Sequence, residues 1–478
     1  MNYSMIFYLL GWSLNIQAVL MLFPSAIAFF FHENALFDFL LVMVLCLAIG
    51  LPLTRKRPKN DTIYAREGFV AVAMVWVVLS LFGSLPFIIT GEIPRFIDAL
   101  FETVSGFSTT GASILTDVES LSKSIMFWRS FTHWIGGMGV LVLLLAILPL
   151  AGGHNFNLVR AESPGPSVSK LTPKLRESAL ILYLIYLGMS ILQFVLLLIA
   201  GMGSFNALLT TFGTAGTGGF GFSNDSMTSQ TPTIQAIISI FMLLFGVNFT
   251  VYYLIITKKF KQALKSEELR VYLAIILVST TIIVFNIRDM FSSFAGAAGK
   301  AFFQVSTIIT TTGYSTDNFD LWPVLSKSIL VLLMFIGASA GSTGGGLKVS
   351  RVVVWVKNFF RELRHTIHPR SVKTLTFEGR PLTDESVKSI GVYLVAYLLI
   401  FVFSVIVTSI DGLDMTTNFT AVASALNNIG PGLAAVGPNG SFAVFSDLSK
   451  SVLIFDMIAG RLELFPILLL LSPGTWKK

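Results

Sequence analysis

Long runs of apolar residues, each about the length of a membrane-spanning helix, dominate the chain. A helix needs roughly 20 apolar residues to cross a bilayer. Ten segments fit, at residues 4–31, 35–53, 67–90, 121–150, 175–201, 232–257, 268–287, 325–360, 386–410 and 447–472. Four shorter helical patterns, too short to cross alone, lie between pairs of spans at 95–108, 204–215, 295–311 and 415–429. The pattern predicts an all-α polytopic membrane protein.

The composition supports the same class. The chain is 54% hydrophobic and only 12% charged, with a mean hydropathy of +0.77, whereas a soluble domain carries about twice that charge. The single cysteine, Cys46, excludes an intrachain disulfide and a cysteine metal cluster. No Lys or Arg precedes the first apolar run, which favours a retained helix over a secretory signal.

The charged residues predict the orientation in the membrane. Loops expected on one side, together with the adjoining ends of the spans, carry 25 Lys and Arg against 10 Asp and Glu. Those on the other side carry 6 against 14. Short cytoplasmic loops are enriched in Lys and Arg, so we expect both termini to be cytoplasmic and the four short helices to open from the outer face. The basic balance thereby reflects topology and gives no argument for nucleic-acid binding.

The segments that follow the four short helices share one glycine. They read FSTTGAS (107–113), AGTGGFG (215–221), ITTTGYS (309–315) and NNIGPG (427–432). Aligned on the glycine, the tripeptides are Thr109-Thr110-Gly111, Thr217-Gly218-Gly219, Thr311-Thr312-Gly313 and Asn428-Ile429-Gly430. The chain therefore predicts four tandem units of span, half-helix, glycine loop and span around a central pore.

These units give predicted boundaries for the whole chain. A two-helix hairpin occupies 1–60, and the four pore repeats follow at 61–150, 151–260, 261–365 and 366–478. The third repeat also holds an intramembrane gate loop, described below.

This unit is typical of potassium channels, in which loop carbonyls replace the hydration shell of the ion. Glycine reaches positive φ without steric cost, and the C-terminal end of each half-helix carries a partial negative charge that favours a cation. None of the twelve tripeptide residues is acidic, which suits potassium better than calcium or magnesium. We expect these twelve residues to form the ion site, although Gly218, Asn428 and Ile429 break its symmetry.

A second glycine run, GASAGSTGGGLK at 337–348, interrupts the segment 325–360. Five glycines in twelve positions, each costing about 1 kcal/mol, cannot propagate a helix. Arg461 is the other unusual feature, because a charge within a span is costly and usually functional.

The four loops, this glycine run and Arg461 resemble the membrane subunit of the Trk/Ktr superfamily of bacterial potassium transporters. The N-terminal hairpin and the length favour the Trk type over the Ktr type, and the resemblance covers essentially the whole chain. It implies potassium uptake across the inner membrane by a homodimer. It also implies a cytosolic ring of nucleotide-binding subunits that controls the gate, with potassium as the transported ion and no bound organic cofactor.

The resemblance also assigns roles to the second glycine run and to Arg461. It implies an intramembrane gate beneath the filter, for which a simple packing break is the alternative. It places Arg461 on the pore pathway, where its charge opposes cation passage, while pairing with Asp456 or Glu463 is the alternative. The expected gate residues are Gly341, Gly344, Gly345, Gly346, Lys348 and Arg461.

Other features allow more than one interpretation. The outer acids Glu102, Asp117, Asp225 and Asp317 could raise the local cation concentration, or they could be ordinary solvated charges. The basic segment 357–388 suits docking of an anionic lipid or a partner protein. Arg129 and His133 are explained most simply by snorkelling to the outer interface.

Competing functions fit less well. The stretch GTGGFG at 216–221 matches the dinucleotide pattern G-x-G-x-x-G, but a polar segment ending at Pro232 follows it where that motif needs a helix. No clustered nucleophile, base or metal ligand supports an enzyme. A secondary symporter that couples potassium to sodium or protons remains the alternative, although such transporters usually show two halves rather than four repeats.

Overall fold

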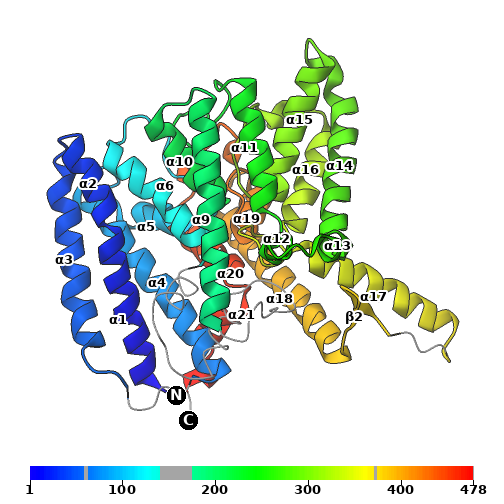
Figure 1. Cartoon of the computed structure of the whole chain (residues 1–478), viewed down its shortest axis with the longest axis horizontal. Helices are drawn as coiled ribbons and strands as arrows, with labels where there is room; N and C mark the ends of the chain where they lie inside the picture. Colours follow the sequence, from blue (N-terminus) through cyan, green and yellow to red (C-terminus); the bar gives the residue numbers. More distant parts are fainter. Residues whose placement is uncertain (59–62, 140–174, 371–373, 477–478) are drawn as a thin grey trace.

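The computed structural model describes residues 1–58, 63–139, 175–370 and 374–476, and most of them are helical (Figure 1). In this part of the chain, six spans are long and apolar enough to cross a membrane, or seven if the bent pair α11 and α12 is one span. The six comprise α1 (Tyr3–Leu20) with α2 (Leu22–Phe30), α3 (Ala35–Thr54), α4 (Ala65–Ile89), α9 (Leu175–Ile199), α14 (Glu267–Ile287) and α18 (Asp384–Thr408). Their bounds agree closely with the predicted spans.

The N-terminal helices α1 and α3 pack side by side, and α1 also contacts α4 (Figure 1). Two glycines allow the close approach. A Cβ on Gly11 would lie 2.7 Å from the Cβ of Leu53, and one on Gly50 would lie 2.3 Å from the Asn15 side chain. No larger residue fits at either position without moving the partner helix.

The four predicted short helices are present as α5 (Phe96–Phe107), α10 (Ser204–Ala215), α15 (Phe294–Ile309) and α19 (Met415–Asn427). Three of them pack against a helix that comes earlier in the chain, in the predicted repeat before their own. α10 contacts α6 (Lys123–Gly137), α15 contacts α11 (Pro232–Phe245), and α19 contacts α16 (Val324–Ile336). The order closes on itself, because α5 contacts α20 (Asp447–Arg461) from the far end of the chain.

Three of the spans that follow the short helices are interrupted within the described residues. As predicted, the glycine run separates α16 from α17 (Val349–Ile367). The predicted continuous spans at 232–257 and 447–472 were wrong. The first bends by 92° between α11 and α12 (Phe249–Ile256), where Asn248 caps the new helix.

The second of these spans breaks between α20 and α21 (Phe465–Leu471), where Glu463 and Leu464 have φ of +58° and +65°. Pro466 is the second residue of α21 and cannot continue α20, because it has no amide hydrogen to donate and its ring clashes with the carbonyl four residues earlier. The predicted span at 121–150 starts as α6, and its residues 140–150 lie outside the described part of the chain.

The remaining elements are short. They are α13 (Phe260–Lys265), α22 (Pro473–Trp476), an antiparallel pair of β1 (Thr376–Phe377) and β2 (Arg380–Pro381), and the turns η1 (Arg288–Met290), η2 (Phe319–Leu321), η3 (Ser409–Asp411), η4 (Ala434–Val436) and η5 (Phe442–Val444).

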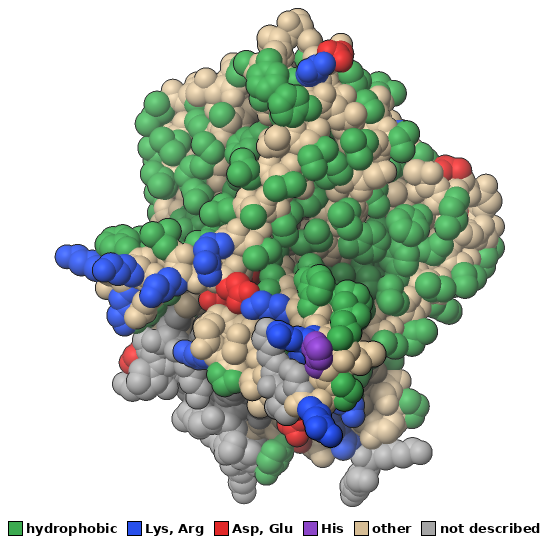
Figure 2. All heavy atoms as spheres, turned by 90° about the vertical axis from the view of Figure 1, so that its right-hand side faces the viewer, with side chains coloured by type: hydrophobic (Ala, Val, Ile, Leu, Met, Phe, Trp, Pro, Cys, Tyr) green, Lys and Arg blue, Asp and Glu red, His purple; other side chains and the backbone are tan. Residues whose placement is uncertain are grey.

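Lys and Arg side chains are unevenly distributed over the face of the molecule that Figure 2 shows. The N- and C-termini lie at the same end, and α17 projects away from the bundle (Figure 1). Figure 2 shows the face on the α14 and α17 side: apolar side chains cover its upper and middle parts, and most Lys and Arg side chains in view gather on its lower part.

Candidate functional site

The four glycine loops share one unusual backbone conformation. The residue two before each glycine lies in the left-handed region, with φ of +58° at Thr109, +54° at Thr217, +57° at Thr311 and +55° at Asn428. The glycines themselves have φ of +79°, +72°, +90° and +104° in chain order, whereas the residue between each pair does not have positive φ. Such alternation places the successive amide groups of each loop on one side of its backbone and the carbonyls on the other.

The amide groups of the loops point back at the short helices. In every loop the amide of the middle residue donates to the carbonyl five residues earlier, with N···O distances of 2.8–3.0 Å. The pairs are Thr110 to Ser105, Gly218 to Gly213, Thr312 to Thr307 and Ile429 to Ser424. Since the amides are taken up by the helix ends, the carbonyls are left to face the other way. In the fourth loop, however, the Gly430 carbonyl accepts from the Ser424 hydroxyl of α19 at 2.5 Å.

The loops form a closed ring, because each leaves space for the next at its glycine. A Cβ on Gly111 would lie 1.9 Å from the carbonyl oxygen of Gly218, one on Gly219 1.9 Å from that of Thr312, and one on Gly313 2.2 Å from that of Ile429. The fourth contact returns to the first loop, where a Cβ on Gly430 would lie 3.0 Å from the carbonyl oxygen of Thr110. The twelve residues predicted as ion ligands are therefore brought together.

Side chains brace the loops from behind. The Thr110 hydroxyl lies 2.7 Å from that of Ser108, and the Thr312 hydroxyl 2.8 Å from that of Thr310. Asn428 is fully buried; it donates to the Thr110 hydroxyl at 2.9 Å and to the Met457 carbonyl at 2.8 Å. The predicted irregularity at Asn428 thus connects the fourth loop to the first.

The glycine-rich run 337–348 lies directly against the third and fourth loops. The Gly345 amide donates to the Thr311 hydroxyl at 2.6 Å, and a Cβ on Gly345 would lie 2.3 Å from the Asn427 carbonyl oxygen. Lys348, which is 3% exposed, donates to the Gly344 carbonyl. A residue larger than glycine at 345 would therefore collide with the end of α19.

Glu268 at the start of α14 binds both this run and the first turn of α17, and sequence analysis missed it. Its carboxylate accepts from the Ala340 amide at 2.7 Å and from the Ser350 amide at 3.1 Å. Glu268 is 4% exposed. The only signal in the sequence was an acidic residue at the beginning of an apolar span, which is common at helix N-termini.

Arg461 connects the glycine-rich run to α6. Its guanidinium donates to the Thr343 carbonyl at 2.8 Å, to the Gly137 carbonyl at 2.7 Å and to the Gly136 carbonyl. The two acids considered as its partners have other contacts. Glu463 forms an ion pair with Arg351, and Asp456 accepts a hydrogen bond from Ser404 at 2.8 Å.

The snorkelling interpretation of Arg129 and His133 was wrong. Arg129 is 2% exposed and pairs with Glu102 at 2.6 Å, and His133 is fully buried beside the second loop. Glu102 is also fully buried and accepts from Ser113 and Ile114 just after the first loop. It is therefore neither a solvated charge nor an exposed attractor of cations, since its negative charge is matched inside the protein.

The other three outer acids stabilise loop structure. Asp317 accepts from the Trp322 indole at 2.8 Å. A hydrogen bond from Asn224, together with those from nearby amides, lowers the pKa of Asp117. Burial raises the pKa of Asp225, but hydrogen bonds from Ser223 and Ser229 outweigh it and lower the pKa overall. Both carboxylates therefore keep their negative charge in mildly acidic solution.

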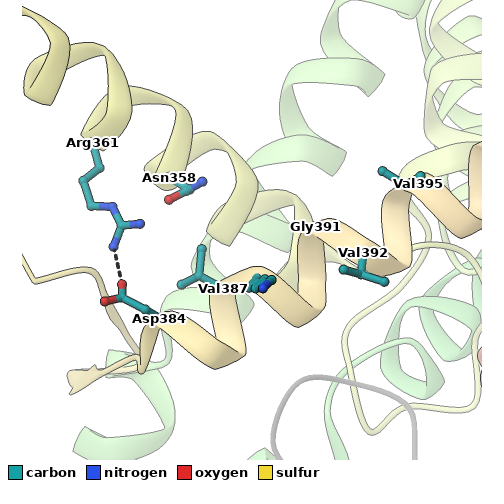
Figure 3. Close-up of a pocket in the computed structure, with 8 residues that line it drawn as sticks. Asn358, Arg361, Asp384, Val387, Gly391, Val392 and Val395 are labelled. Atoms are coloured by element: carbon teal, nitrogen blue, oxygen red, sulfur yellow. Dashed lines mark hydrogen bonds and ion pairs between the residues drawn. The ribbon is translucent and has the colours of Figure 1, made fainter.

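A shallow cleft of about 710 Å³ lies between α17 and α18, partly within the basic segment 357–388 (Figure 3). Asn358 and Arg361 line it from α17, and Arg361 pairs with Asp384 of α18 at 3.2 Å. The α18 side continues with Val387, Lys388, Gly391, Val392 and Val395. The cleft thus combines basic groups at one end with an apolar wall.

Comparison with known proteins identifies the family. The family model described as TrkH, cation transport protein, matches residues 35–477. The chain belongs to the TrkH cation transport family. The resemblance to Trk-type transporters is thereby confirmed, and the chain is a multi-pass membrane subunit of that family.

Several TrkH relatives match over all or nearly all of their lengths. The Trk system potassium uptake protein TrkH of Escherichia coli K12 is 36% identical over 468 residues, which is 96% of each chain. That of Vibrio parahaemolyticus is 35% identical over 487 residues and 100% of each chain. The crystal structure of the potassium transporter TrkH from Vibrio parahaemolyticus superposes with a TM-score of 0.90 at 33% identity, again covering 100% of each chain.

Proposed function

We propose that this protein carries potassium into the bacterial cell through a channel-like pore whose filter is the ring of four glycine loops. The observation that carries the proposal is the closed order of contacts, in which each glycine touches the carbonyl of the next loop and the fourth touches the first. Buried backbone at membrane depth is tolerated where it lines a watery cavity. Carbonyl oxygens on one side of such loops can replace the hydration shell of the ion.

The proposal includes the fourfold repeat at 61–150, 151–260, 261–365 and 366–478, with the hairpin at 1–60 outside it. The matching φ values of the four loops support this division. So does the cyclic packing of the short helices, in which each contacts a helix of the preceding unit. A transporter built from two halves, as many symporters are, does not require this cyclic packing of four short helices.

The run 337–348 is the proposed gate beneath the filter. Its position against Thr311 and Asn427 supports this role, since loop movement there would open or close the space below the ring. Arg461 would place a positive charge beside the gate through its contact with Thr343. That charge would oppose cations while the gate is closed.

The orientation and partners also belong to the proposal. The basic end seen in Figure 2 would face the cytoplasm, together with both termini. The protein would act as a homodimer in the inner membrane under the control of a cytosolic nucleotide-binding ring subunit. The basic segment 357–388, including the cleft of Figure 3, would then dock that subunit or anionic lipid.

The test is rubidium and sodium uptake into liposomes that contain the purified full-length protein. Gly219→Ser and Gly313→Ser should each lower the preference for rubidium, because a side chain would collide with the neighbouring carbonyl. Gly299→Ser on α15 is the matched control, since the space beside Gly299 is open. Normal preference in both filter variants would overturn the filter assignment.

The same liposomes separate a channel from a symporter. A channel should conduct rubidium down its own gradient without any sodium or proton gradient. Uptake that strictly requires one of those gradients would instead support the symporter. The filter variants would then change the affinity for the transported ion rather than its passive flow through a pore.

A further inference from the structure

His133 of α6 has a contact pattern that the proposed function does not by itself explain. Its Nδ1 lies 2.7 Å from the Gly106 carbonyl oxygen at the end of α5, and its Nε2 lies 3.2 Å from the Phe220 amide nitrogen in the second loop. A carbonyl can only accept and an amide can only donate. The imidazole must therefore be neutral, with its proton on Nδ1 and a bare Nε2.

The imidazole also fills the space behind the second loop. Its ring centroid lies 4.1 Å from that of Phe220, and a Cβ on Gly218 would lie 2.4 Å from its Nδ1. Arg129, one helical turn earlier, places its guanidinium carbon 3.5 Å from the centroid of the Phe220 ring and donates to the Gly221 carbonyl at 3.0 Å. Two side chains of α6 thus fix the position of Phe220.

The hydrogen bond to the Phe220 amide extends a row of successive loop amides that each have an acceptor. The amides of Thr217, Gly218 and Gly219 bond back to carbonyls of Thr214 and Gly213 near the end of α10. The Phe220 amide, next along the chain, instead donates to His133. His133 therefore supplies the acceptor for the Phe220 amide, which is the first amide of the loop that does not bond to α10.

This amide shares a peptide plane with the Gly219 carbonyl. In a trans peptide the N–H and C=O groups point in opposite directions. His133 lies behind the loop and accepts from the Phe220 N–H. The Gly219 carbonyl is therefore turned the other way, away from α6. The fourth loop lacks this arrangement, because Pro431 has no amide hydrogen and the Gly430 carbonyl accepts from Ser424 at 2.5 Å.

The geometry points to His133 as a positioning residue of the filter. Through Nε2 it sets the direction of the Gly219 carbonyl and so contributes to the preference for potassium over sodium. This inference rests on the proposed function, because it assumes that the Gly219 carbonyl faces the ion.

Two substitutions separate the two hydrogen bonds of His133. In His133→Gln the amide oxygen reaches about as far as Nε2, so the acceptor for Phe220 is kept. In His133→Asn the shorter amide reaches only the Nδ1 position, so the bond to Gly106 is kept and the Phe220 amide loses its acceptor. His32→Asn is the matched control, because His32 is exposed and Asn tolerates its φ of +56°.

The readout is the ratio of rubidium to sodium uptake in liposomes. His133→Asn should lower this ratio by about tenfold, the equivalent of ~1.4 kcal/mol of preference, while His133→Gln and His32→Asn keep most of it. A wild-type ratio in folded His133→Asn would overturn the inference. So would an equal loss in His133→Gln, since that result indicates packing rather than the acceptor. Wild-type protein without any preference would instead refute the proposed function.

A measurement on the wild-type protein keeps the inference testable if the Asn variant fails to fold. Nitrogen-15 spectra of histidine-labelled protein in bilayers should show one neutral ring protonated at Nδ1 between about pH 6 and pH 8, a range centred near the ordinary titration range of histidine. Its signal is identified by its loss in His133→Gln. A cationic ring, or a proton on Nε2, would contradict the geometry whatever the transport result.

Discussion

A graded alanine series at the four ring glycines tests the proposed filter most directly. All four have positive φ, between +72° and +104°, so each alanine bears a similar backbone strain of about 1–2 kcal/mol. The contacts of the added Cβ differ from loop to loop. The series therefore separates strain from the collision with the neighbouring carbonyl.

The four collisions differ in how far the neighbouring carbonyl must move. Ordinary contact with a Cβ begins at 3.4 Å. The added Cβ would lie 1.9 Å from the carbonyl oxygen in Gly111→Ala and Gly219→Ala, 2.2 Å in Gly313→Ala and 3.0 Å in Gly430→Ala. The shorter the distance, the further the carbonyl is displaced. Since a filter selects ions by the placement of its carbonyls, we expect the loss of selectivity to follow this order.

The assay is competitive uptake of rubidium and sodium into liposomes, with the amount of folded protein measured for each variant. Gly111→Ala and Gly219→Ala should lower the uptake ratio by more than about tenfold, or ~1.4 kcal/mol of preference, and Gly430→Ala should have the smallest effect. Gly299→Ala serves as the control, because the space beside Gly299 is open. An effect of Gly430→Ala as large as that of Gly219→Ala would refute the reasoning from carbonyl displacement.

Three further predictions concern the gate and the buried ion pair. Deleting residues 344–346 should raise uptake in the absence of regulatory subunits, because it removes the segment packed against Thr311; a folded deletion protein that conducts no more than wild type would contradict the gate. Arg461→Gln should also raise the initial rate of rubidium uptake by removing a positive charge next to that segment, and an unchanged rate would contradict a role on the pathway. Arg129→Leu leaves the carboxylate of Glu102 unpaired and should cost about 3–5 kcal/mol of stability. Thermal unfolding in detergent should show a smaller loss of stability in the double variant Arg129→Leu/Glu102→Leu than in Arg129→Leu alone. An equal loss of stability in the two variants would argue against the ion pair.

Much of the fold follows from the sequence because the membrane restricts what a chain can do. Apolar length predicted most of the spans, and the short helices between them were recognisable because each is too short to cross a bilayer. The glycine at each loop was visible because no other residue takes its backbone conformation without strain. Local rules of this kind need no knowledge of which residues become neighbours.

The breaks in two spans and the partners of buried charges could not be predicted in this way. The segment 232–257 has no charged residue, and its 92° bend is set by contacts such as that of the Phe249 amide with the Gly341 carbonyl. Arg129 and His133 looked like interfacial residues, because their partners Glu102 and Phe220 lie 27 and 87 positions away in the chain.

The sequence by itself thus determined that this is a membrane protein with four glycine loops, and it located the residues of those loops. Only the tertiary structure decided that Gly430, near the end of the chain, lies against Thr110 of the first loop, so that the four loops close into a ring. The physical reason is that hydropathy and backbone conformation are properties of single segments. A ring depends on packing between segments, where each glycine leaves just enough room for the carbonyl of its neighbour.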